Sequence, residues 1–129
     1  MNERRLLSTD SPFERAGAYS RAVVQGPWCL LSGTTGYDYA TMTISPDVRE
    51  QTRQTMRTVT AVLRDAGFEL SDVVRITCVV AEREYWPIVY EILGKEFKDI
   101  RPTLLTYIAP LIEPDMKVEL QMTALRKGA

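Results

Sequence analysis

The sequence predicts an α+β domain in which two helices cover one face of a mixed sheet. Three observations indicate this fold: a long amphipathic helix in the first half of the chain, a β-branched stretch directly after it, and a strictly alternating strand near the end. The chain has 129 residues, of which 45% are hydrophobic. We therefore expect a single domain, residues 1–129, large enough to bury its own core.

Residues 1–17 are polar and mixed, and they predict little regular structure. Pro12 and Gly17 are residues that usually interrupt helices and strands. Only residues 3–6 are a candidate for a further strand.

Residues 19–32 predict a β-hairpin. Side chains alternate along residues 19–25 as they do in a short strand. Gly26 and Pro27 are turn residues, so residues 28–32 are expected to return beside the first strand. The glycines and threonines of residues 33–36 are expected to break the pairing.

The strongest prediction is a helix that begins near Ser45 and ends near Gly67. Ser45 is a favourable N-cap, Pro46 suits the first helical turn, and Asp47 complements the helix dipole. Gly67 is typical of a C-terminal cap. Mostly apolar positions recur every three or four residues and form one face: Val48, Thr52, Met56, Val59, Leu63 and Ala66. The opposite face carries Arg49, Arg53 and Arg57, diluted by the acidic residues Asp47, Glu50 and Asp65.

The second half predicts a strand, a helix and two more strands. Residues 72–81 are rich in β-branched residues, which favours a strand. Residues 84–97 predict a helix with Pro87 in its first turn. Its buried side is expected to hold three residues spaced by four: Val89, Leu93 and Phe97. Residues 103–109 and 116–125 predict strands.

With only two helices, one face of this sheet has nothing to cover it. The simplest way to bury that face is against other copies of the chain.

The composition excludes several kinds of chemistry. There is no histidine, so serine–histidine triads, cysteine–histidine dyads and histidine-ligated metal sites are impossible. The two cysteines, Cys29 and Cys78, are too few for a four-ligand zinc site and are expected to be reduced core thiols. We expect no metal and no cofactor.

Charge and hydropathy bear on partners and compartment. The formal net charge is −1, which disfavours a dedicated nucleic-acid or anionic-membrane binder. No stretch has the length of a membrane span, and the first residues lack the apolar core of a signal peptide. We therefore expect a cytoplasmic protein.

Several segments together resemble the Rid family, also called YjgF or reactive-intermediate deaminases. The most specific piece is the long helix that ends in the AG-x-x-L-x-D-V-V entry to the following strand. The matching segments are residues 16–23 (AGAYSRAV), 30–36 (LLSGTTG), 51–80, 85–97 (YWPIVYEILGKEF), 101–109 (RPTLLTYIA) and 117–124 (KVELQMTA).

The resemblance implies a chorismate-mutase-like fold and a homotrimer whose sheets enclose a central barrel. It also implies that small-molecule clefts lie at the subunit interfaces. The type activity of the family is hydrolysis of reactive enamines and imines to keto acids and ammonia, without a cofactor. Older names in the family include endoribonuclease.

The resemblance also implies roles for particular residues. Tyr19 matches a tyrosine that borders the family's cleft, and Ser32 and Gly33 match a serine–glycine pair there. Glu119 matches the carboxylate thought to hold the attacking water. The family's substrate-binding arginine is missing, because Leu104 stands in its place in the RPTL stretch.

This leucine changes the expected ligand. An arginine fork binds a substrate carboxylate bidentately, and a leucine cannot. Its loss should cost about 2–5 kcal/mol for a carboxylate-bearing substrate. Leu104 shares strand parity with Thr106 and Ile108, so this face presents an apolar wall with one hydroxyl. Arg21 is a candidate to supply the missing positive charge, because it lies two residues beyond Tyr19 on the same expected strand.

Each candidate also has an ordinary structural interpretation. Glu119 can be a solvated carboxylate beside Lys117, and Arg21 can be a surface arginine. Tyr19 and Thr106 can be ordinary strand residues, and the Ser32–Gly33 pair can belong to a hairpin end rather than to an anion-binding nest. The leading hypothesis is a cofactor-free hydrolase of C=N bonds with an unusual substrate. The alternatives are a non-catalytic trimer that binds a metabolite or a protein and, more remotely, an endoribonuclease.

Overall fold

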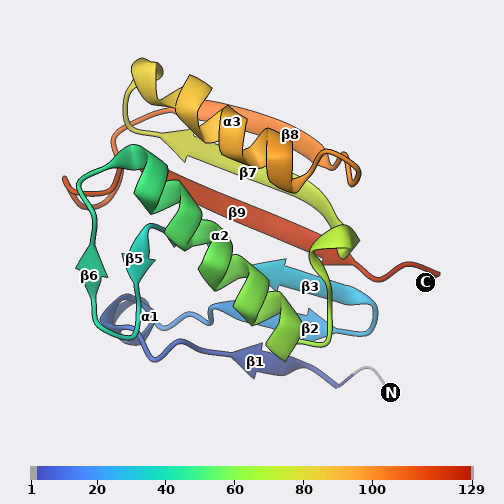
Figure 1. Ribbon diagram of the computed structural model, residues 1–129. Coiled ribbons are helices and arrows are strands. Elements are labelled where there is room, and N and C mark those ends of the chain that lie inside the picture. Colours follow the sequence, from blue (N-terminus) through green and yellow to red (C-terminus); the bar gives the residue numbers. More distant parts are fainter. Residues whose placement is uncertain (1–2, 129) are drawn as a thin grey trace.

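The computed structural model describes residues 3–128 and has the predicted α+β architecture. Figure 1 shows the two long helices lying on the same face of one twisted sheet. The strands of this sheet follow the order β1-β2-β3-β9-β7-β8, and β4 also pairs with β9. All neighbours are antiparallel except β7 and β8, which are parallel and are joined by a helical crossover.

The elements follow the predicted order with several additions. The helices are α1 (Pro12–Gly17), α2 (Val48–Asp65) and α3 (Trp86–Glu96), with 3₁₀ turns at Leu70–Asp72 and Arg83–Tyr85. The strands are β1 (Arg5–Leu7), β2 (Ala22–Gln25), β3 (Trp28–Leu31), β4 (Thr34–Thr35), β5 (Tyr37–Asp38), β6 (Thr43–Ile44), β7 (Val73–Val80), β8 (Thr103–Ile108) and β9 (Val118–Leu125).

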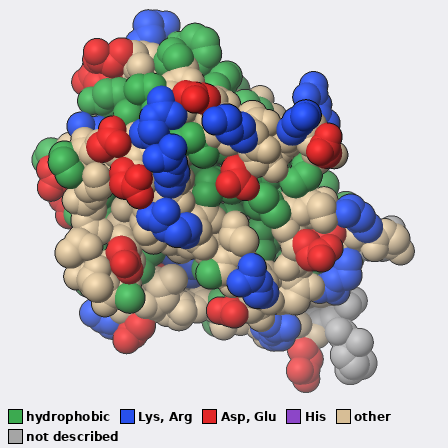
Figure 2. Space-filling model, viewed as in Figure 1, with side chains coloured by type: hydrophobic (Ala, Val, Ile, Leu, Met, Phe, Trp, Pro, Cys, Tyr) green, Lys and Arg blue, Asp and Glu red, His purple; other side chains and the backbone are tan. Residues whose placement is uncertain are grey.

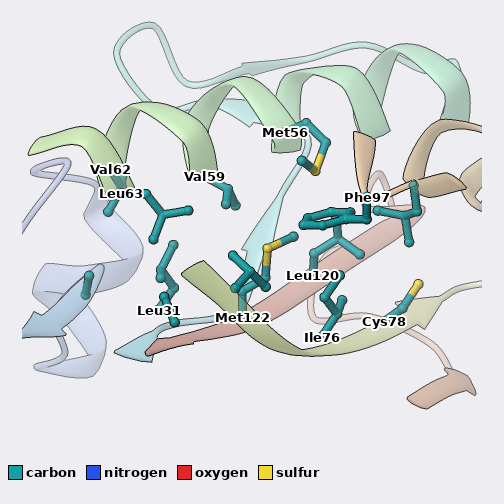
Figure 3. Close-up of a cluster of buried hydrophobic side chains, with 14 of the residues drawn as sticks. Leu31, Met56, Val59, Val62, Leu63, Ile76, Cys78, Phe97, Leu120 and Met122 are labelled. Carbon is teal, nitrogen blue, oxygen red and sulfur yellow. The ribbon is translucent and has the colours of Figure 1, made fainter. Parts of the chain in front are cut away.

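The core lies between α2, α3 and the sheet, as the periodicity of α2 predicts (Figure 3). Every position of the predicted α2 face is buried, including Met56, Val59 and Leu63. On β9 the alternating set that begins at Val118 faces the same core. Cys29 on β3 and Cys78 on β7 are both fully buried free thiols.

The prediction that residues 1–17 lack a helix is wrong. The chain forms α1, whose N-cap Ser11 accepts hydrogen bonds from the backbone N–H groups of Phe13 and Glu14 at 3.1 and 3.3 Å. Pro12 occupies the first helical turn, where its missing N–H and fixed φ are compatible with a helix. Pro12 therefore starts the helix instead of interrupting it.

The predicted break at residues 33–36 is also wrong in part. The chain leaves β3 at Ser32, but Thr34 and Thr35 pair again with β9 as β4. Gly36 then lets the backbone approach α2, because a Cβ there would lie 2.7 Å from the Cα of Gln51. A two-stranded ribbon, β5 and β6, follows and was not predicted.

Several element ends differ from the prediction. The first hairpin strand begins at Ala22, so Tyr19 and Arg21 precede the regular strand. The N-cap of α2 is Asp47, and the Ser45 hydroxyl accepts from the Asp47 N–H at 3.2 Å instead. Gly67 follows α2 with a φ of 84°, a left-handed conformation that glycine tolerates best.

The sheet face away from the helices is open, and apolar side chains are exposed on both sides of the central strand β9. Trp28 and Leu30 on β3 are exposed at one side, and Leu105 and Tyr107 on β8 at the other. Every residue of β8 except Thr106 is exposed, on an edge strand with one free side. Such an edge invites pairing or packing with another chain.

The helix face is charged and mixed. Figure 2 shows basic and acidic side chains interspersed on this face. Three arginines of α2 pair with carboxylates: Arg49 with Glu91 at 3.0 Å, and Arg53 and Arg57 with Glu50 at 3.5 and 3.3 Å. Among residues 3–128, no helix has the length and apolar character that crossing a bilayer requires.

Candidate active site

A cleft of about 670 Å³ lies where α1, β4, β5 and the start of β9 meet. Of the residues singled out in the sequence, the cleft brings together Tyr19, Gly33 and Glu119. The remainder of its wall is formed largely by aromatic and apolar side chains, including Phe13, Tyr37, Tyr39, Met42, Ile112 and Met116. A volume of this size suits a small organic molecule.

Glu119 is the central acidic group of the cleft. It lies on β9 opposite Thr35 of β4, and it alternates with core residues, so its side chain points away from the helices. Gly33 lies directly against it, since a Cβ on Gly33 would stand 2.9 Å from the Glu119 Cδ and closer still to Oε2. A glycine is therefore required for the carboxylate to occupy this position.

The environment of Glu119 favours its protonated form more than water does. Burial raises the pKa of Glu119 above its ordinary value of 4.5, and the nearby positive charge of Arg21 offsets this in part. A partly buried carboxyl group with a raised pKa can accept and return a proton near neutral pH.

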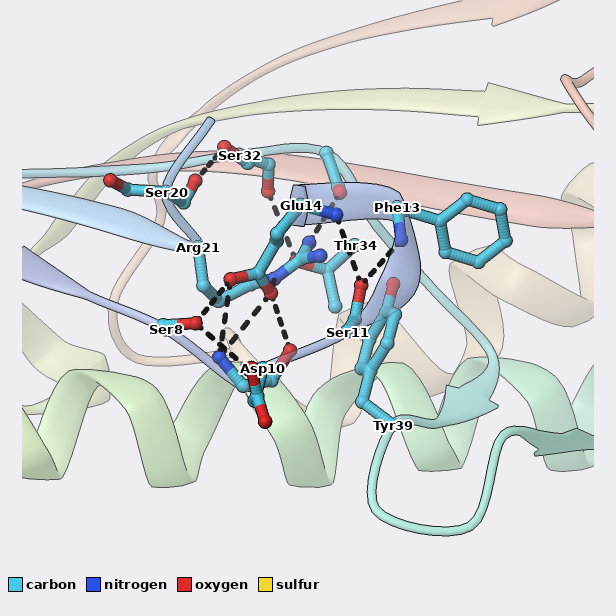
Figure 4. A network of polar contacts seen from close by, with 12 residues as sticks. Ser8, Asp10, Ser11, Phe13, Glu14, Ser20, Arg21, Ser32, Thr34 and Tyr39 are labelled. Carbon is cyan, nitrogen blue, oxygen red and sulfur yellow. Dashed lines mark hydrogen bonds and ion pairs between the residues drawn. The ribbon is translucent and has the colours of Figure 1, made fainter. Parts of the chain in front are cut away.

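Arg21 and Glu14 form a buried ion pair behind the cleft (Figure 4). The Arg21 side chain is 1% exposed and its Nε donates to Glu14 Oε2 at 3.1 Å. Its Nη1 donates to the Gly33 carbonyl at 2.7 Å and to the Thr34 hydroxyl at 3.3 Å. Arg21 is therefore not a surface arginine, and it ties α1 to the turn that carries Gly33.

Glu14 is held as a carboxylate by several donors. Burial raises its pKa, but hydrogen bonds from Thr9 and Ser8 and the charge of Arg21 outweigh burial, so the net pKa lies below the ordinary value. Ser8 Oγ donates to Glu14 Oε1 at 2.8 Å, and the Thr9 hydroxyl donates to Oε2. Hydrogen bonds from the protein thus replace the water that both charges lose on burial, which a stable buried ion pair requires.

Tyr39 connects this network to the cleft. Its ring lies 4.5 Å from the Arg21 Cζ, within the range of a cation–π contact. Its hydroxyl accepts a hydrogen bond from the Thr35 N–H at 3.1 Å and lies 3.2 Å from the Thr35 hydroxyl. The ring is therefore fixed on one side by charge and on the other by the β4 backbone.

Two more rings continue this wall. The rings of Phe13 and Tyr37 meet edge to face with centroids 5.6 Å apart, and those of Tyr37 and Tyr39 are 6.4 Å apart. Tyr19 is 42% exposed and its centroid lies 5.8 Å from the Arg21 Cζ. Three aromatic side chains joined through Tyr37, with Tyr19 beside them, make a largely apolar surface.

Ser32 lies beside this cleft without lining it. Its hydroxyl donates to the Ser20 carbonyl at 2.6 Å, and its N–H donates to the Arg21 carbonyl at 2.8 Å. Both hydrogen bonds therefore tie the link between β3 and β4 to the segment just before β2.

Leu104 and Thr106 do not line this cleft. On β8 they pair with Ile76 and Cys78, both core residues, so they face the helix side of the sheet, away from Glu119. Leu104 lines a separate cavity of about 420 Å³ under α3, and the Thr106 hydroxyl lies 2.7 Å from the Tyr90 hydroxyl. A single chain thus does not bring Leu104 and Glu119 together.

The sequence reasoning missed Glu14, Tyr39 and Phe13. A pattern for α1 was present, because Ser11-Pro12-Phe13-Glu14 has the S-x-x-E spacing of a helix N-terminus. Nothing local indicates that Glu14 would bind Arg21. Within residues 3–128, no three or more cysteine or acidic side chains gather as a metal site would require.

Comparison with known proteins gives consistent results. A family model described as endoribonuclease L-PSP matches residues 9–126. A human 2-iminobutanoate/2-iminopropanoate deaminase is 27% identical over 124 residues, covering 95% of this chain and 90% of its own length. A RutC family protein of Pyrococcus horikoshii is 23% identical over 125 residues, covering 96% of this chain and 99% of its own.

Solved structures show the same likeness. The crystal structure of a member of the YjgF/YER057c/UK114 family from Mycobacterium tuberculosis is 36% identical, with a TM-score of 0.83. The alignment covers 95% of this chain and 99% of that one.

Proposed function

Since the chain belongs to the endoribonuclease L-PSP family, also called the YjgF or Rid family, we propose that it is a cofactor-free hydrolase of C=N bonds. The single observation that carries this proposal is the position of Glu119. It lies in a small-molecule cleft against a glycine, with a raised pKa and open cleft volume in front of it. Relatives such as the human protein are named as imine deaminases.

Hydrolysis of an imine requires one protein group that accepts and returns protons. As a carboxylate, Glu119 removes a proton from a water molecule. At the same time the water oxygen bonds to the carbon of a protonated imine. The resulting carbinolamine takes that proton on nitrogen. The C–N bond then breaks and ammonia leaves, while the hydroxyl proton moves to the carboxylate. Glu119 passes this proton to the ammonia, which forms ammonium and restores the carboxylate. The products are a carbonyl compound and ammonium, so atoms and charge balance without a cofactor.

Arg21 has a supporting role in this proposal. Its guanidinium holds the Gly33 carbonyl, and Gly33 gives the Glu119 carboxylate its space. The positive charge of Arg21 also keeps the pKa of Glu119 from rising further. We therefore treat Arg21 as a positioning residue, whereas Tyr19 and Gly33 line the ligand's space directly.

We further propose that the working form is a homotrimer whose clefts lie between subunits. Support comes from Trp28 and Leu30, which are exposed on the open face, and from β8, an edge strand whose Leu105 and Tyr107 are more than half exposed. Leu104 and Thr106 of a neighbouring copy are proposed to close the cleft that holds Glu119. A cytoplasmic location is the matching proposal, because two buried, unpaired thiols suit a reducing compartment.

Leu104 limits the substrate in this assembly. Where a partner's arginine would bind a substrate carboxylate, a leucine offers only hydrocarbon. We therefore expect the standard imino-acid substrates of named relatives to be poor substrates here. The endoribonuclease in the family's name receives no support from the basic stripe of α2, because Arg49, Arg53 and Arg57 are paired with acids.

The test generates 2-iminopropionate in situ and follows its decay with the wild type, Glu119→Gln and Leu104→Arg. We expect weak wild-type turnover, gain in Leu104→Arg, and loss in Glu119→Gln. The matched control is Glu96→Gln, which neutralises an exposed carboxylate at the end of α3. Strong wild-type turnover of this imine would contradict the role given to Leu104. No turnover of any imine, together with ligand binding in a thermal-shift measurement, would favour the non-catalytic binding protein.

A further inference from the structure

The wall of the Glu119 cleft has a chemistry that does not match an anionic ligand. Four aromatic side chains line it, Phe13, Tyr19, Tyr37 and Tyr39. Two carboxylates line it as well, Glu113 and Glu119. Among residues 3–128, no lysine or arginine is part of this lining.

The Arg21 guanidinium behind the cleft is not offered to a ligand. Arg21 is 1% exposed, and its charge is matched by Glu14 at 3.1 Å. Its Nη1 is bonded to Gly33 and Thr34, and its Nη2, although without a hydrogen-bond partner, is fully buried. Tyr39 stacks against the guanidinium at 4.5 Å. Among residues 3–128 of the same chain, a carboxylate in the cleft therefore finds no lining cation to bind.

Aromatic faces with nearby carboxylates are instead the environment that binds organic cations. The negative face of an aromatic ring attracts positive charge, and each carboxylate adds a longer-range attraction that water screens less in a concave site. The same charges favour the protonated form of a bound imine. That protonated form is the better electrophile for water.

We propose that the substrates of this cleft are iminium ions that carry a hydrocarbon or aromatic substituent and no carboxylate. This inference rests on the proposed hydrolase function and names its substrate class. The reaction is R–CH=NH₂⁺ + H₂O → R–CHO + NH₄⁺, in which the C=N bond is replaced by C=O and no electron is transferred. In the proposed trimer, the partner copy's leucine at position 104 would face the substituent R, and hydrocarbon against hydrocarbon is favourable there.

The first arm of the test compares two imines that share a benzyl group. A flavin amine oxidase acting on phenethylamine releases the imine without a carboxylate, and an amino-acid oxidase acting on phenylalanine releases the corresponding imino acid. Imine lifetime is followed by trapping with semicarbazide. We expect the wild type to accelerate decay of the carboxylate-free imine at least about 10-fold more than that of the imino acid. Faster decay of the imino acid would overturn the inference and leave the hydrolase proposal standing.

The second arm measures binding and does not depend on turnover. Benzyltrimethylammonium and phenylacetate have similar size and opposite charge, and their dissociation constants are compared by calorimetry. We expect the cation to bind at least about 10-fold more tightly, and Glu113→Gln to weaken it about 3- to 10-fold. Glu96→Gln, which removes an exposed carboxylate outside the cleft, is the matched control.

The two arms separate the possible failures. Cation binding without turnover of either imine would refute the hydrolase and leave the ligand class supported. Preference for phenylacetate, or equal effects of Glu113→Gln and Glu96→Gln on cation binding, would overturn the ligand class itself.

Discussion

The β4–β9 side of the cleft is completed by its own chain, whereas the β8 edge is left incomplete. On the first side, Arg21, Glu14 and the Gly33 carbonyl form a buried network that fixes the position of Glu119. On the second, Leu104 and Tyr107 are exposed side chains on an edge strand. The Glu119 side is therefore fixed within one chain, whereas in the proposed assembly a neighbouring copy would complete the β8 edge.

The largest expected effect comes from breaking the buried pair. Arg21→Ala leaves Glu14 without its partner in a site that is almost closed to water, so the free energy of unfolding should fall by about 3–5 kcal/mol. Urea unfolding measures this. Arg49→Ala breaks a more exposed pair and should cost less than about 1 kcal/mol. Equal losses of unfolding free energy in both variants would show that the buried Arg21–Glu14 pair stabilises the fold no more than an exposed ion pair does.

The next effect concerns the β8 edge. Tyr107→Lys places a charge in the proposed subunit contact and removes a large apolar side chain, which should weaken each contact by about 2–3 kcal/mol. Light scattering should show a trimeric wild type and a dissociated variant with nearly unchanged secondary structure. Ala61→Lys, on the exposed face of α2, is the control and should remain assembled. A monomeric wild type would contradict the proposed assembly.

A smaller effect follows from the close approach at Gly33. Gly33→Ala forces the Glu119 carboxylate to move, because the new Cβ would overlap it, and should cost about 1–3 kcal/mol of stability. Imine turnover should fall more than stability does, since the displaced carboxylate no longer faces the cleft. In α3, nothing lies within 4 Å of a Cβ at Gly94, so Gly94→Ala should stabilise the protein by about 0.5–1 kcal/mol. A harmless Gly33→Ala would refute the steric argument.

The smallest effect is a pH dependence with opposite signs for the two glutamates. The folded-state pKa of Glu14 is lowered, so its ionisation stabilises the fold above its ordinary value of 4.5, and this contribution is lost as the pH falls below that value. The pKa of Glu119 is raised, so the stability gained when it is protonated is present at low pH and is lost as the pH rises through the folded pKa.

Stability measured from pH 3 to 8 tests these signs. Glu14→Gln should destabilise the protein near pH 7, with a difference that shrinks toward pH 3. Glu119→Gln should stabilise it slightly near pH 7, and this gain should also shrink in acid. The same sign for both variants near pH 7 would contradict the contrast between the two carboxylates.

Local patterns predicted the helices and strands of the core well. The 3.6-residue spacing from Val48 to Ala66 and the alternation from Val118 to Ala124 each follow from one element facing one core. Short elements were harder, because α1 and β4 depend on a single cap or on pairing with a distant strand. Pro12 was interpreted as a breaker although Ser11 before it is a good N-cap.

The site depends on contacts that no local pattern contains. The Arg21–Glu14 pair joins a short helix to the chain after it, and its burial comes from Thr34 and Tyr39. Strand parity correctly placed Leu104 and Thr106 on one face, but it does not say which face of the sheet holds the cleft. That relation appears only when β8 is placed beside β7 and β7 beside β9.

The two buried thiols offer a native reporter of how this sheet opens. Cys29 pairs with Ala124 and Cys78 with Leu120, so they flank the central strand β9 from opposite sides. Burial raises the pKa of each thiol to about 11, which leaves almost no thiolate to react near neutral pH while the sheet is closed. Alkylation by a mass-tagged reagent, resolved by peptide, would therefore time the separation of β3 and of β7 from β9 independently, in the unaltered protein.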